Sequence, residues 1–502
     1  MKTSITLTLC LLMAAAVTAD DKPNILFIMS DDHAAGAIGA YGSRLATLNP
    51  TPVIDRLARE GVLFEKAYCN NSICTPSRAS IITGQYSQAN GVLDLSGKLP
   101  PAKQYLPVEM KKAGYQTALV GKWHLEEEPA TFDYYCALPE QGEYINPSFL
   151  VQGTKSWPGN TVQYEGHSSD IITDISLKWL ANKRDKSKPF FLMHQFKAPH
   201  HPFTPAPRYQ SYLENVGIPE PSNLYWMLDP TNSKFGSVAT RGHNDSLVGK
   251  IGPAMGGSGD RQSIHKRYQE RFTNYLRCVK GIDDNIKRLM DYLESTGELE
   301  NTIVIYTSDQ GYFIGEHGWT DKRFMYEESM RMPLIMRHPS LVKAGRRTDL
   351  LVSNTDFAPT LIDLAGGAVP GHMQGRSFAG ELMGNTPRNW RDALYYRYWM
   401  HGQLRVPAHF GIRTSDYKLI FFYGRHYGTV VPRWSMPATP AAWELYDMKN
   451  DPQESTNLYG RPEYDDVVAQ LKQRLAQLRT DLNETDEKYP ELQEIIDAHW
   501  HD

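Results

Sequence analysis

Cysteine is scarce in this sequence, and positive charge is not in excess. Five of the 502 residues are cysteine, and the formal net charge is −4. So few cysteines in a chain of this length exclude a small domain held together by disulfides. The lack of a net positive charge argues against nucleic acid as the main partner, because no excess of basic side chains is present to neutralise the phosphates. A locally basic pocket for a small anion is still compatible with this charge.

Long hydrophobic runs are also missing after the first 19 residues. A membrane-spanning helix needs about 18 or more uninterrupted apolar residues, so we expect no membrane anchor. At the N-terminus, an apolar run over residues 5–17 follows Met1-Lys2 and ends in small residues suited to cleavage before Asp20. We interpret residues 1–19 as a secretory signal peptide, with a buried first helix as the alternative. The expected location is periplasmic or secreted.

What the sequence does contain is typical of a large α/β enzyme. Hydrophobic residues make up 41% and charged residues 22% of the chain. Short apolar runs with β propensity recur at 24–29, 117–120, 190–196, 302–306 and 334–336. Such runs fit strands buried on both faces of a parallel sheet. Helical segments lie between them, one of them with an apolar stripe of Leu276, Val279, Ile282, Ile286, Leu289 and Leu293. This alternation predicts a doubly wound, mostly parallel central sheet.

The C-terminal part predicts a smaller unit. A segment rich in proline and glycine at 366–375 precedes short β-like runs at 394–399, 410–413, 418–423 and 443–447. An amphipathic helix then follows, with Val468, Leu471, Leu475, Leu478 and Leu482 spaced three and four residues apart. We expect an antiparallel sheet with one helix here. The predicted division is a signal peptide at 1–19, an N-terminal catalytic domain at 20–375 and a C-terminal subdomain at 376–502.

Polar residues follow the carboxyl ends of several predicted strands. Asp31-Asp32 follow the first run, Lys122 and His124 the second, His200 the third and Asp309-Gln310 the fourth. Open α/β sheets bind ligands in the crevice outside the carboxyl ends of their strands. We therefore expect these side chains to share one site.

The segment Cys74-Thr75-Pro76-Ser77-Arg78 is the most informative motif. A proline in a first helical turn costs nothing, because the backbone N–H that it lacks would be unpaired there anyway. Cys74 is therefore expected near a helix N-terminus, with Arg78 close by, where anions are favoured. Two alternatives are a thiolate nucleophile activated by the helix end and a buried structural cysteine.

This motif, with Thr83-Gly84 after it, resembles the signature of the formylglycine-dependent sulfatases. The resemblance extends over nearly the whole chain after the signal segment, and residues 308–333 look closest to bacterial polysaccharide sulfatases. It implies that a formylglycine-generating or sulfatase-maturing enzyme oxidises Cys74 to formylglycine (3-oxoalanine). At most one disulfide could then form among Cys69, Cys136 and Cys278.

Oxygen donors at two strand ends suggest a metal site. The carboxylates of Asp31, Asp32 and Asp309 and the amide oxygen of Gln310 are hard ligands of the kind that Ca²⁺ or Mg²⁺ prefers. The alternative is that each aspartate caps a following helix. The family resemblance implies calcium, bound together with the formylglycine oxygen at position 74. Gln310 stands where the family usually has asparagine.

The resemblance also implies roles for the charged residues. Arg78 would hold the hydrated aldehyde, and Lys122 and Lys322 would bind the sulfate. His124 in Gly121-Lys122-Trp123-His124 would contact the hydrate, and His200 in Ala198-Pro199-His200 would protonate the leaving alcohol. The alternatives are a surface ion pair for Arg78 and plain surface residues for the Lys-x-His pair. Sequence alone does not fully separate His200 from its neighbour His201.

Weaker candidates complete the predicted site. His317 is either a substrate contact or a structural loop histidine. Basic and aromatic side chains could line the rim of the pocket and contact a sugar, and these are Arg405, Arg425, His426, Arg433 and Trp434.

We expect a sulfatase acting on a carbohydrate, most simply an oligosaccharide from a sulfated polysaccharide. A broad arylsulfatase is a variant of this hypothesis. A phosphonate or phosphate diester hydrolase of the same superfamily is the second hypothesis. The third is an exported binder of sulfated glycans in which Cys74 stays unconverted.

Overall fold

The computed structural model describes residues 22–502, except 154, 229–259, 403, 405 and 428–436. The predicted signal peptide and three predicted rim residues, Arg405, Arg433 and Trp434, lie outside the described residues. No described helix combines the length and apolar character that a membrane crossing requires.

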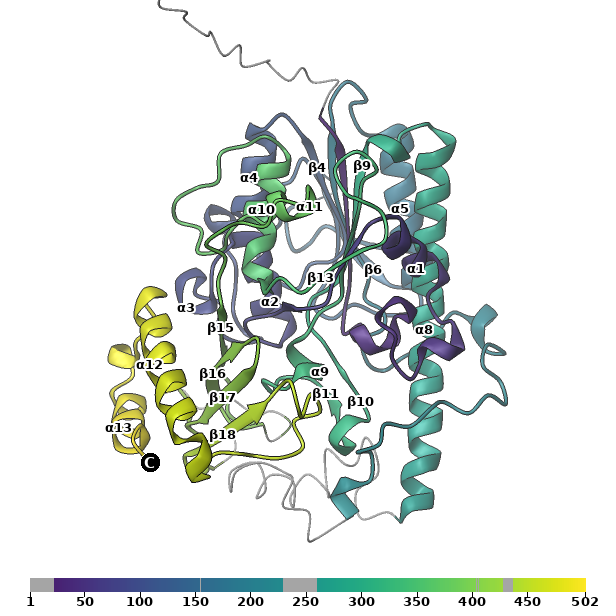
Figure 1. Ribbon diagram of the computed structural model, residues 1–502. Coiled ribbons are helices and arrows are strands. Elements are labelled where there is room, and N and C mark those ends of the chain that lie inside the picture. Colours follow the sequence, from purple (N-terminus) through teal and green to yellow (C-terminus); the bar gives the residue numbers. More distant parts are fainter. Residues whose placement is uncertain (1–21, 154, 229–259, 403, 405, 428–436) are drawn as a thin grey trace, which may run out of the picture.

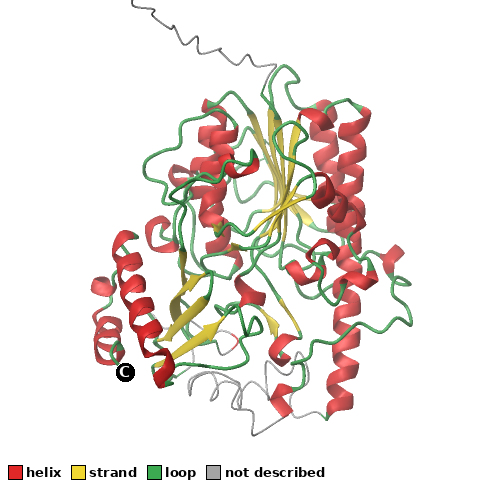
Figure 2. Ribbon diagram, in the orientation of Figure 1, coloured by secondary structure: helices red, strands yellow, loops and turns green. Residues whose placement is uncertain are grey.

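A central sheet of ten described strands organises the larger part of the chain (Figures 1 and 2). The strand order is β13-β2-β12-β9-β1-β8-β4-β5-β6-β7. The bounds are β1 (Asn24–Ser30), β2 (Val62–Phe64), β4 (Gln116–Lys122), β5 (Tyr134–Leu138), β6 (Ser148–Val151), β7 (Thr161–Gln163), β8 (Phe190–Gln195), β9 (Thr302–Ser308), β12 (Leu334–Arg337) and β13 (Arg346–Thr348). Strands β9, β1, β8, β4 and β5 are mutually parallel. The predicted doubly wound, mostly parallel sheet is confirmed.

Strand β12 differs from the prediction because it runs antiparallel to β9 and β2. Parallel neighbours need a crossover of a dozen or more residues, usually a helix. Between β9 and β12 the chain forms short elements only, namely β10 (Phe313–Ile314), β11 (Thr320–Asp321) and α9 (Glu327–Met330). It therefore returns antiparallel, and Arg337 at the end of β12 pairs with Glu60 and Glu300.

Helices cover both faces of this sheet (Figure 2). One layer contains α1 (Pro52–Glu60), α5 (Ser168–Asn182) and α8 (Arg261–Ser295). The other contains α2 (Cys74–Thr83), α4 (Tyr105–Lys112) and α10 (Phe357–Leu364). Alternate residues of β1 enter the two cores, which explains why its whole run is apolar. The predicted stripe of α8 is confirmed, since all six residues are buried.

The C-terminal part forms the predicted antiparallel sheet of β15 (Ala393–Tyr398), β16 (His409–Thr414), β17 (Tyr417–Phe422) and β18 (Ala442–Asp447). One face packs on the larger core through Tyr396 and Ile420, and the other packs on α12 (Asp465–Asp481). A second helix, α13 (Pro490–His499), follows α12. The prediction of a single helix was therefore wrong, because α13 is too short to show a clear apolar period. The boundary at residue 375 stays a prediction.

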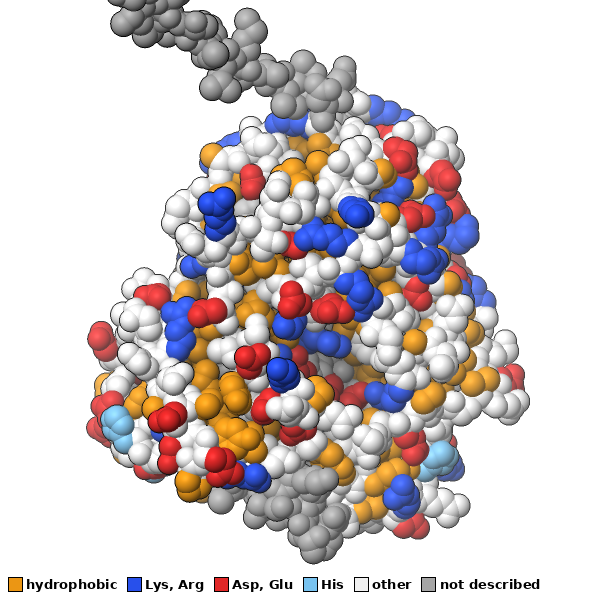
Figure 3. Space-filling model, in the orientation of Figure 1, with side chains coloured by type: hydrophobic (Ala, Val, Ile, Leu, Met, Phe, Trp, Pro, Cys, Tyr) orange, Lys and Arg blue, Asp and Glu red, His pale blue; other side chains and the backbone are white. Residues whose placement is uncertain are grey.

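The remaining described elements are short. They are β3 (Ala67–Tyr68), β14 (Val352–Ser353), α3 (Ser87–Asn90) and α11 (Ala379–Leu382), besides several single 3₁₀ turns. On the face shown in Figure 3, acidic and basic side chains are interspersed.

Candidate active site

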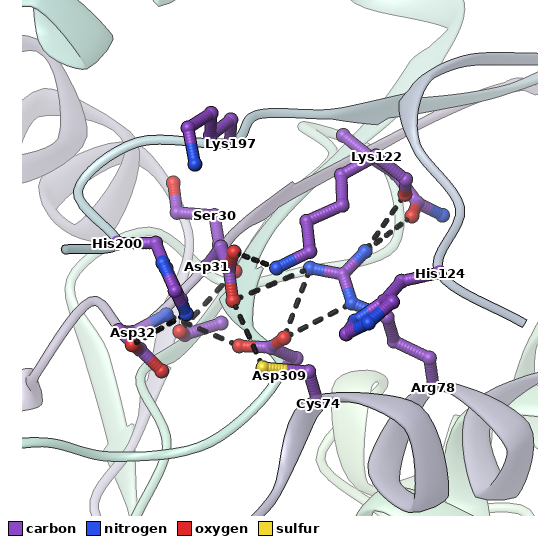
Figure 4. A network of polar contacts seen from close by, with 12 residues as sticks. Ser30, Asp31, Asp32, Cys74, Arg78, Lys122, His124, Lys197, His200 and Asp309 are labelled. Carbon is purple, nitrogen blue, oxygen red and sulfur yellow. Dashed lines mark hydrogen bonds and ion pairs between the residues drawn. The ribbon is translucent and has the colours of Figure 1, made fainter. Parts of the chain in front are cut away.

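The carboxyl ends of β1, β4, β8 and β9 meet the N-terminus of α2 at one edge of the sheet. Asp31 directly follows β1, Asp309 directly follows β9, and Cys74 is the first residue of α2. Figure 4 shows their side chains turned toward one another. The structure therefore brings together the residues that the strand-end pattern predicted.

Three carboxylates crowd together at the centre of this site. Oxygen atoms of Asp31, Asp32 and Asp309 all lie within 4.8 Å of one another, and the three side chains are buried. Burial and the charge of Asp31 raise the pKa of Asp309 to about 7. Burial also raises the pKa of Asp32, against the attraction of Lys322. Although burial opposes it, Lys122 holds the pKa of Asp31 well below its usual value.

Three cationic side chains face these carboxylates. Lys122 Nζ pairs with Asp31, and Lys322 Nζ lies 2.6 and 2.5 Å from the two carboxylate oxygens of Asp32. Arg78 donates from Nε at 3.0 Å to Asp309 Oδ2, and its Nη2 lies 2.9 Å from the same oxygen. Arg78 is buried, so the structure does not support the surface ion pair considered for it.

Cys74 lies against this cluster. Its Sγ is 3.4 Å from Asp31 Oδ1 and 3.7 Å from Gln310 Nε2. Burial and the negative charge of Asp31 raise the pKa of the thiol to about 12. The thiolate is the nucleophilic form of cysteine. An unmodified Cys74 would therefore be a poor nucleophile at neutral pH. This disfavours the alternative in which Cys74 acts as a thiolate nucleophile activated by the helix end.

The donor set fits a hard divalent cation. Gln310 donates from Nε2 to Asp32, while its Oε1 is buried without a hydrogen-bond partner among the described residues. The orientation of an amide is assigned from its surroundings, and a rotated amide would direct Oε1 at the carboxylates. Three carboxylates and one amide oxygen are the ligand types of Ca²⁺ or Mg²⁺. A cation would also relieve the repulsion between the carboxylates.

Two histidines border the cluster. His200 Nε2 lies 3.7 Å from Asp32 Oδ2, whereas His201 is exposed and its ring packs on Phe203. The structure thus places His200 at the site, as preferred from the sequence. His124 is buried beside Gln141, with 3.5 Å between their Nε2 atoms. Burial lowers the pKa of both His124 and His200 well below the usual value, which favours the neutral form of each ring.

Unusual backbone conformations position several of these groups. Asp32 and His124 have φ of +67° and +55°, and Asp321 and Arg323 on either side of Lys322 have φ of +78° and +91°. Such left-handed conformations cost energy in non-glycine residues and concentrate at functional sites. Gly121 precedes Lys122 because a Cβ there would lie 1.8 Å from the carbonyl oxygen of Gln195.

Three polar residues of the site were missed from the sequence. Gln195 accepts a hydrogen bond from Arg78 Nη1 at 2.8 Å, Gln141 accepts one from Lys122 at 2.7 Å, and Lys197 is buried next to them. Gln195 and Lys197 stand at the end of a buried strand, so the strand-end rule could have found them. Gln141 lies in the loop after β5 and belongs to no motif.

The weaker candidates have different surroundings. His317 is buried, with Nε2 3.4 Å from Glu328 Oε2 and its ring stacked on Tyr326. Arg425 is exposed, and His426 is half-buried. These surroundings suit a structural role for His317, and substrate contacts by all three stay predictions.

Comparison with known proteins identifies the family. A family profile described as "Sulfatase" matches residues 23–368, and one described as "N-sulphoglucosamine sulphohydrolase, C-terminal" matches 315–481. An N-acetylglucosamine-6-O-sulfatase of Bacteroides thetaiotaomicron is 39% identical over 93% of this chain and 88% of its own length. An N-acetylglucosamine-6-sulfatase of Capra hircus is 30% identical over 78% of this chain and 69% of its own.

Solved structures agree in fold. One, a protein in complex with its substrate D-glucosamine-2-N,6-O-disulfate, has a TM-score of 0.81 and 37% identity, covering 93% of this chain and 99% of that one. A phosphonate monoester hydrolase from Silicibacter pomeroyi has a TM-score of 0.70 and 21% identity, covering 93% and 96%, and shares the fold alone. The chain belongs to the sulfatase family, whose members hydrolyse sulfuric esters.

Proposed function

We propose that this sulfatase removes the 6-O-sulfate from N-acetylglucosamine or glucosamine units of a sulfated carbohydrate. The observation that carries this proposal is the 39% identity, over nearly the full length of both chains, to a protein named for 6-O-desulfation of N-acetylglucosamine. The structural neighbour whose substrate is a 6-O-sulfated glucosamine supports the same substrate class. The carbohydrate predicted from the sequence is thereby narrowed to a 6-sulfated amino sugar.

The active form proposed here carries formylglycine at position 74. A formylglycine-generating or sulfatase-maturing enzyme would supply the oxidation. The high pKa of the buried thiol supports this proposal, because unmodified Cys74 is a weak nucleophile. Cys74, once oxidised, would supply a hydrated aldehyde with two hydroxyls on one carbon. One hydroxyl would serve as the nucleophile that displaces the sugar oxygen from sulfur, and loss of the proton of the other would release the sulfate anion.

Asp31, Asp32, Asp309 and Gln310 would hold the cation, with Ca²⁺ as the proposal and Mg²⁺ as the alternative. A divalent cation at this point supplies positive charge that stabilises oxygen anions and lowers the pKa of a neighbouring hydroxyl. Gln310 differs from the asparagine that is usual in the family, because its amide stands on a longer arm. Its unpartnered buried Oε1 supports including it.

The surrounding side chains would bind the sulfate, orient the group at position 74 and transfer protons. Lys122 and Lys322 would bind sulfate oxygens, and Arg78 would orient the group at position 74. Neutral His124 is in the protonation state of a base, and its Nε2 lone pair, which among the described residues is engaged only by a long 3.5 Å contact with Gln141, would accept a proton from a hydroxyl. His200 would protonate the departing sugar oxygen, and a bound sulfate anion would favour its charged form.

Export remains part of the proposal. Residues 1–19 have the sequence pattern of a secretory signal peptide, which supports a periplasmic or secreted enzyme that meets its polysaccharide outside the cytoplasm. The expected partners are the sulfated carbohydrate and the maturing enzyme, without a nucleic acid or a membrane anchor.

A substrate panel tests the proposal. Protein co-produced with a maturing enzyme is assayed for anion release from N-acetylglucosamine-6-sulfate, the 3-sulfate isomer, N-sulfoglucosamine, an aryl sulfate and an aryl phosphonate. We expect kcat/KM for the 6-sulfate to exceed the others by about 100-fold or more. Faster turnover of the phosphonate would support the second hypothesis. Glycan binding without turnover, by protein from its native host that retains the Cys74 thiol, would support the binding protein.

A further inference from the structure

Lys197 is a buried cation without a carboxylate partner among the described residues. The residue is 3% exposed, and its ammonium group forms no ion pair within 4.0 Å in the part of the chain that the structure describes. Instead, Nζ donates a hydrogen bond of 3.0 Å to the carbonyl oxygen of Gln141 and lies 4.8 Å from the ring centroid of Tyr144. Burying an ammonium group in this way is costly, so a functional benefit is expected.

We propose that Lys197 is a positioning residue for sulfate ester hydrolysis, which ties the loop at 139–147 to the segment that carries His200. The loop connects β5 to β6, and the His200 segment follows β8. Figure 4 shows the amine end of Lys197 turned toward the charged cluster. This inference rests on the roles proposed above for Lys122, His124 and His200.

The first connection runs through Gln141. While its carbonyl oxygen is held by Lys197, its side-chain oxygen accepts a hydrogen bond of 2.7 Å from Lys122 Nζ. The amide nitrogen of the same side chain then faces Nε2 of His124 at 3.5 Å. Because that nitrogen is a donor, the facing His124 nitrogen is the one that carries the lone pair. Gln141 therefore sets the distance between Lys122 and His124 and orients the histidine.

The second connection runs through Tyr144. Its ring receives the ammonium group of Lys197, and its hydroxyl donates a hydrogen bond of 2.6 Å to the carbonyl oxygen of His200. The His200 ring is oriented in turn by the contact of Nδ1 with the carbonyl oxygen of His201 at 2.7 Å. One ammonium group thus links both sides of the site, although it touches neither His124 nor His200. The contact with the Tyr144 ring needs the charge of Lys197, and the bond to Gln141 needs its N–H donor. An apolar side chain of similar length lacks both.

The test compares Lys197→Met with a matched control. Lys183 also lies over a tyrosine ring, 4.7 Å from the centroid of Tyr134, but it is exposed on the surface after α5. Turnover is measured on whichever sulfate ester the wild-type enzyme hydrolyses best, together with the free energy of unfolding. We expect Lys197→Met to lower kcat about 10- to 100-fold with KM changed less than about threefold. Lys183→Met is expected to leave both unchanged.

A double-mutant cycle with Gln141→Ala shows whether Lys197 acts through Gln141. We expect the two losses in kcat to be clearly less than multiplicative, since each variant breaks the same connection. Fully multiplicative losses, an unchanged kcat in folded Lys197→Met, or a rise in KM alone would each overturn the proposal. If Lys197→Met does not fold, Tyr144→Phe replaces it, because it keeps the ring and removes the hydroxyl, which bonds to the carbonyl oxygen of His200 and also to the Cys278 thiol. An unchanged kcat in Tyr144→Phe would then contradict the proposal. Failure of the wider function would show separately, as absent sulfate release by the wild-type enzyme.

Discussion

Two buried groups of charges in this molecule both pair carboxylates with cations, but they differ in the balance between attraction and repulsion. In the C-terminal part, Arg397 and Arg479 each contact both Glu484 and Asp486, for example at 2.8 Å from Arg397 Nη2 to Asp486 Oδ1 and 2.6 Å from Arg479 Nη2 to Asp486 Oδ2. Although burial opposes it, the two arginines lower the pKa of Asp486. This group, the C-terminal ion cluster, is a closed network of opposite charges.

At the active site the carboxylates crowd one another. Asp309 lies beside Asp31 and Asp32, and burial with this like charge raises its pKa to about 7. The backbone is also in the left-handed region at Asp32 and at His124. In the buried C-terminal ion cluster attraction dominates, which suits a structural role. At the equally buried active site the carboxylates repel one another, which suits a site that binds a cation and an anion.

The largest effect on activity is expected at Asp309. Replacing it with alanine removes a carboxylate from the proposed cation site and the partner of Arg78. We expect Asp309→Ala to lower kcat/KM at least about 10³-fold, measured as sulfate release. In the metal-free protein the relief of repulsion between carboxylates opposes the loss of the partner of Arg78, so we expect the free energy of unfolding to fall less than in Asp486→Ala. A rate within a few-fold of wild type would contradict the comparison.

The corresponding change in the C-terminal ion cluster should affect stability instead. Asp486→Ala leaves Arg397 and Arg479 sharing a single carboxylate in a buried place. We expect the free energy of unfolding, measured with urea, to fall by about 3–5 kcal/mol. The kcat of the remaining folded enzyme should stay within about twofold. A loss of kcat as large as that of Asp309→Ala would show that the two clusters do not differ in function.

The raised pKa of Asp309 predicts a pH dependence of stability. Between pH 3.8 and about 7 the folded carboxyl keeps a proton that the unfolded chain has lost. The contribution of this group to the free energy of unfolding therefore decreases as pH rises through that window. In chelator-treated protein, Asp309→Asn should gain stability relative to wild type between pH 5 and pH 8. The two proteins share all other titrating groups, whose effects cancel when their free energies of unfolding are subtracted. A difference in the free energy of unfolding that does not change with pH would contradict the raised pKa of Asp309.

The smallest effect is expected from Gln310→Asn, which shortens the arm of one proposed ligand and keeps its amide. We expect the calcium concentration for half-maximal activity to rise by up to about tenfold, with kcat at saturating calcium close to wild type. Gln116→Asn at the start of β4 is the control. An unchanged calcium dependence in both variants would remove Gln310 from the ligand set.

Much of the fold could be predicted because its strands are buried on both faces. The run at 24–29 is apolar throughout for this reason, and the polar residues beyond such runs then fall at one sheet edge. That rule placed Asp31, Asp309 and His200 correctly. The direction of β12 could not be predicted, because it depends on the length and shape of a connection and not on the run itself.

Other parts of the site depend on contacts that local sequence does not encode. Gln141 contacts Lys122 and His124 from a loop without a motif, and its role follows only from where β5 ends beside β4. The difference between His200 and His201 likewise depends on which ring turns inward. The raised pKa of Asp309, in contrast to the lowered pKa of Asp486 in the C-terminal ion cluster, is likewise a property of the folded chain.

The most direct measurement is sulfate release per folded molecule by Cys74→Ala, compared with wild type under the same maturation and calcium. Cys74 is buried at the crowded carboxylates, and alanine keeps the helix position while removing the group to be oxidised. The account predicts a loss of at least about 10⁴-fold in rate with an unchanged free energy of unfolding. Release of sulfate at the wild-type rate by this variant would contradict it.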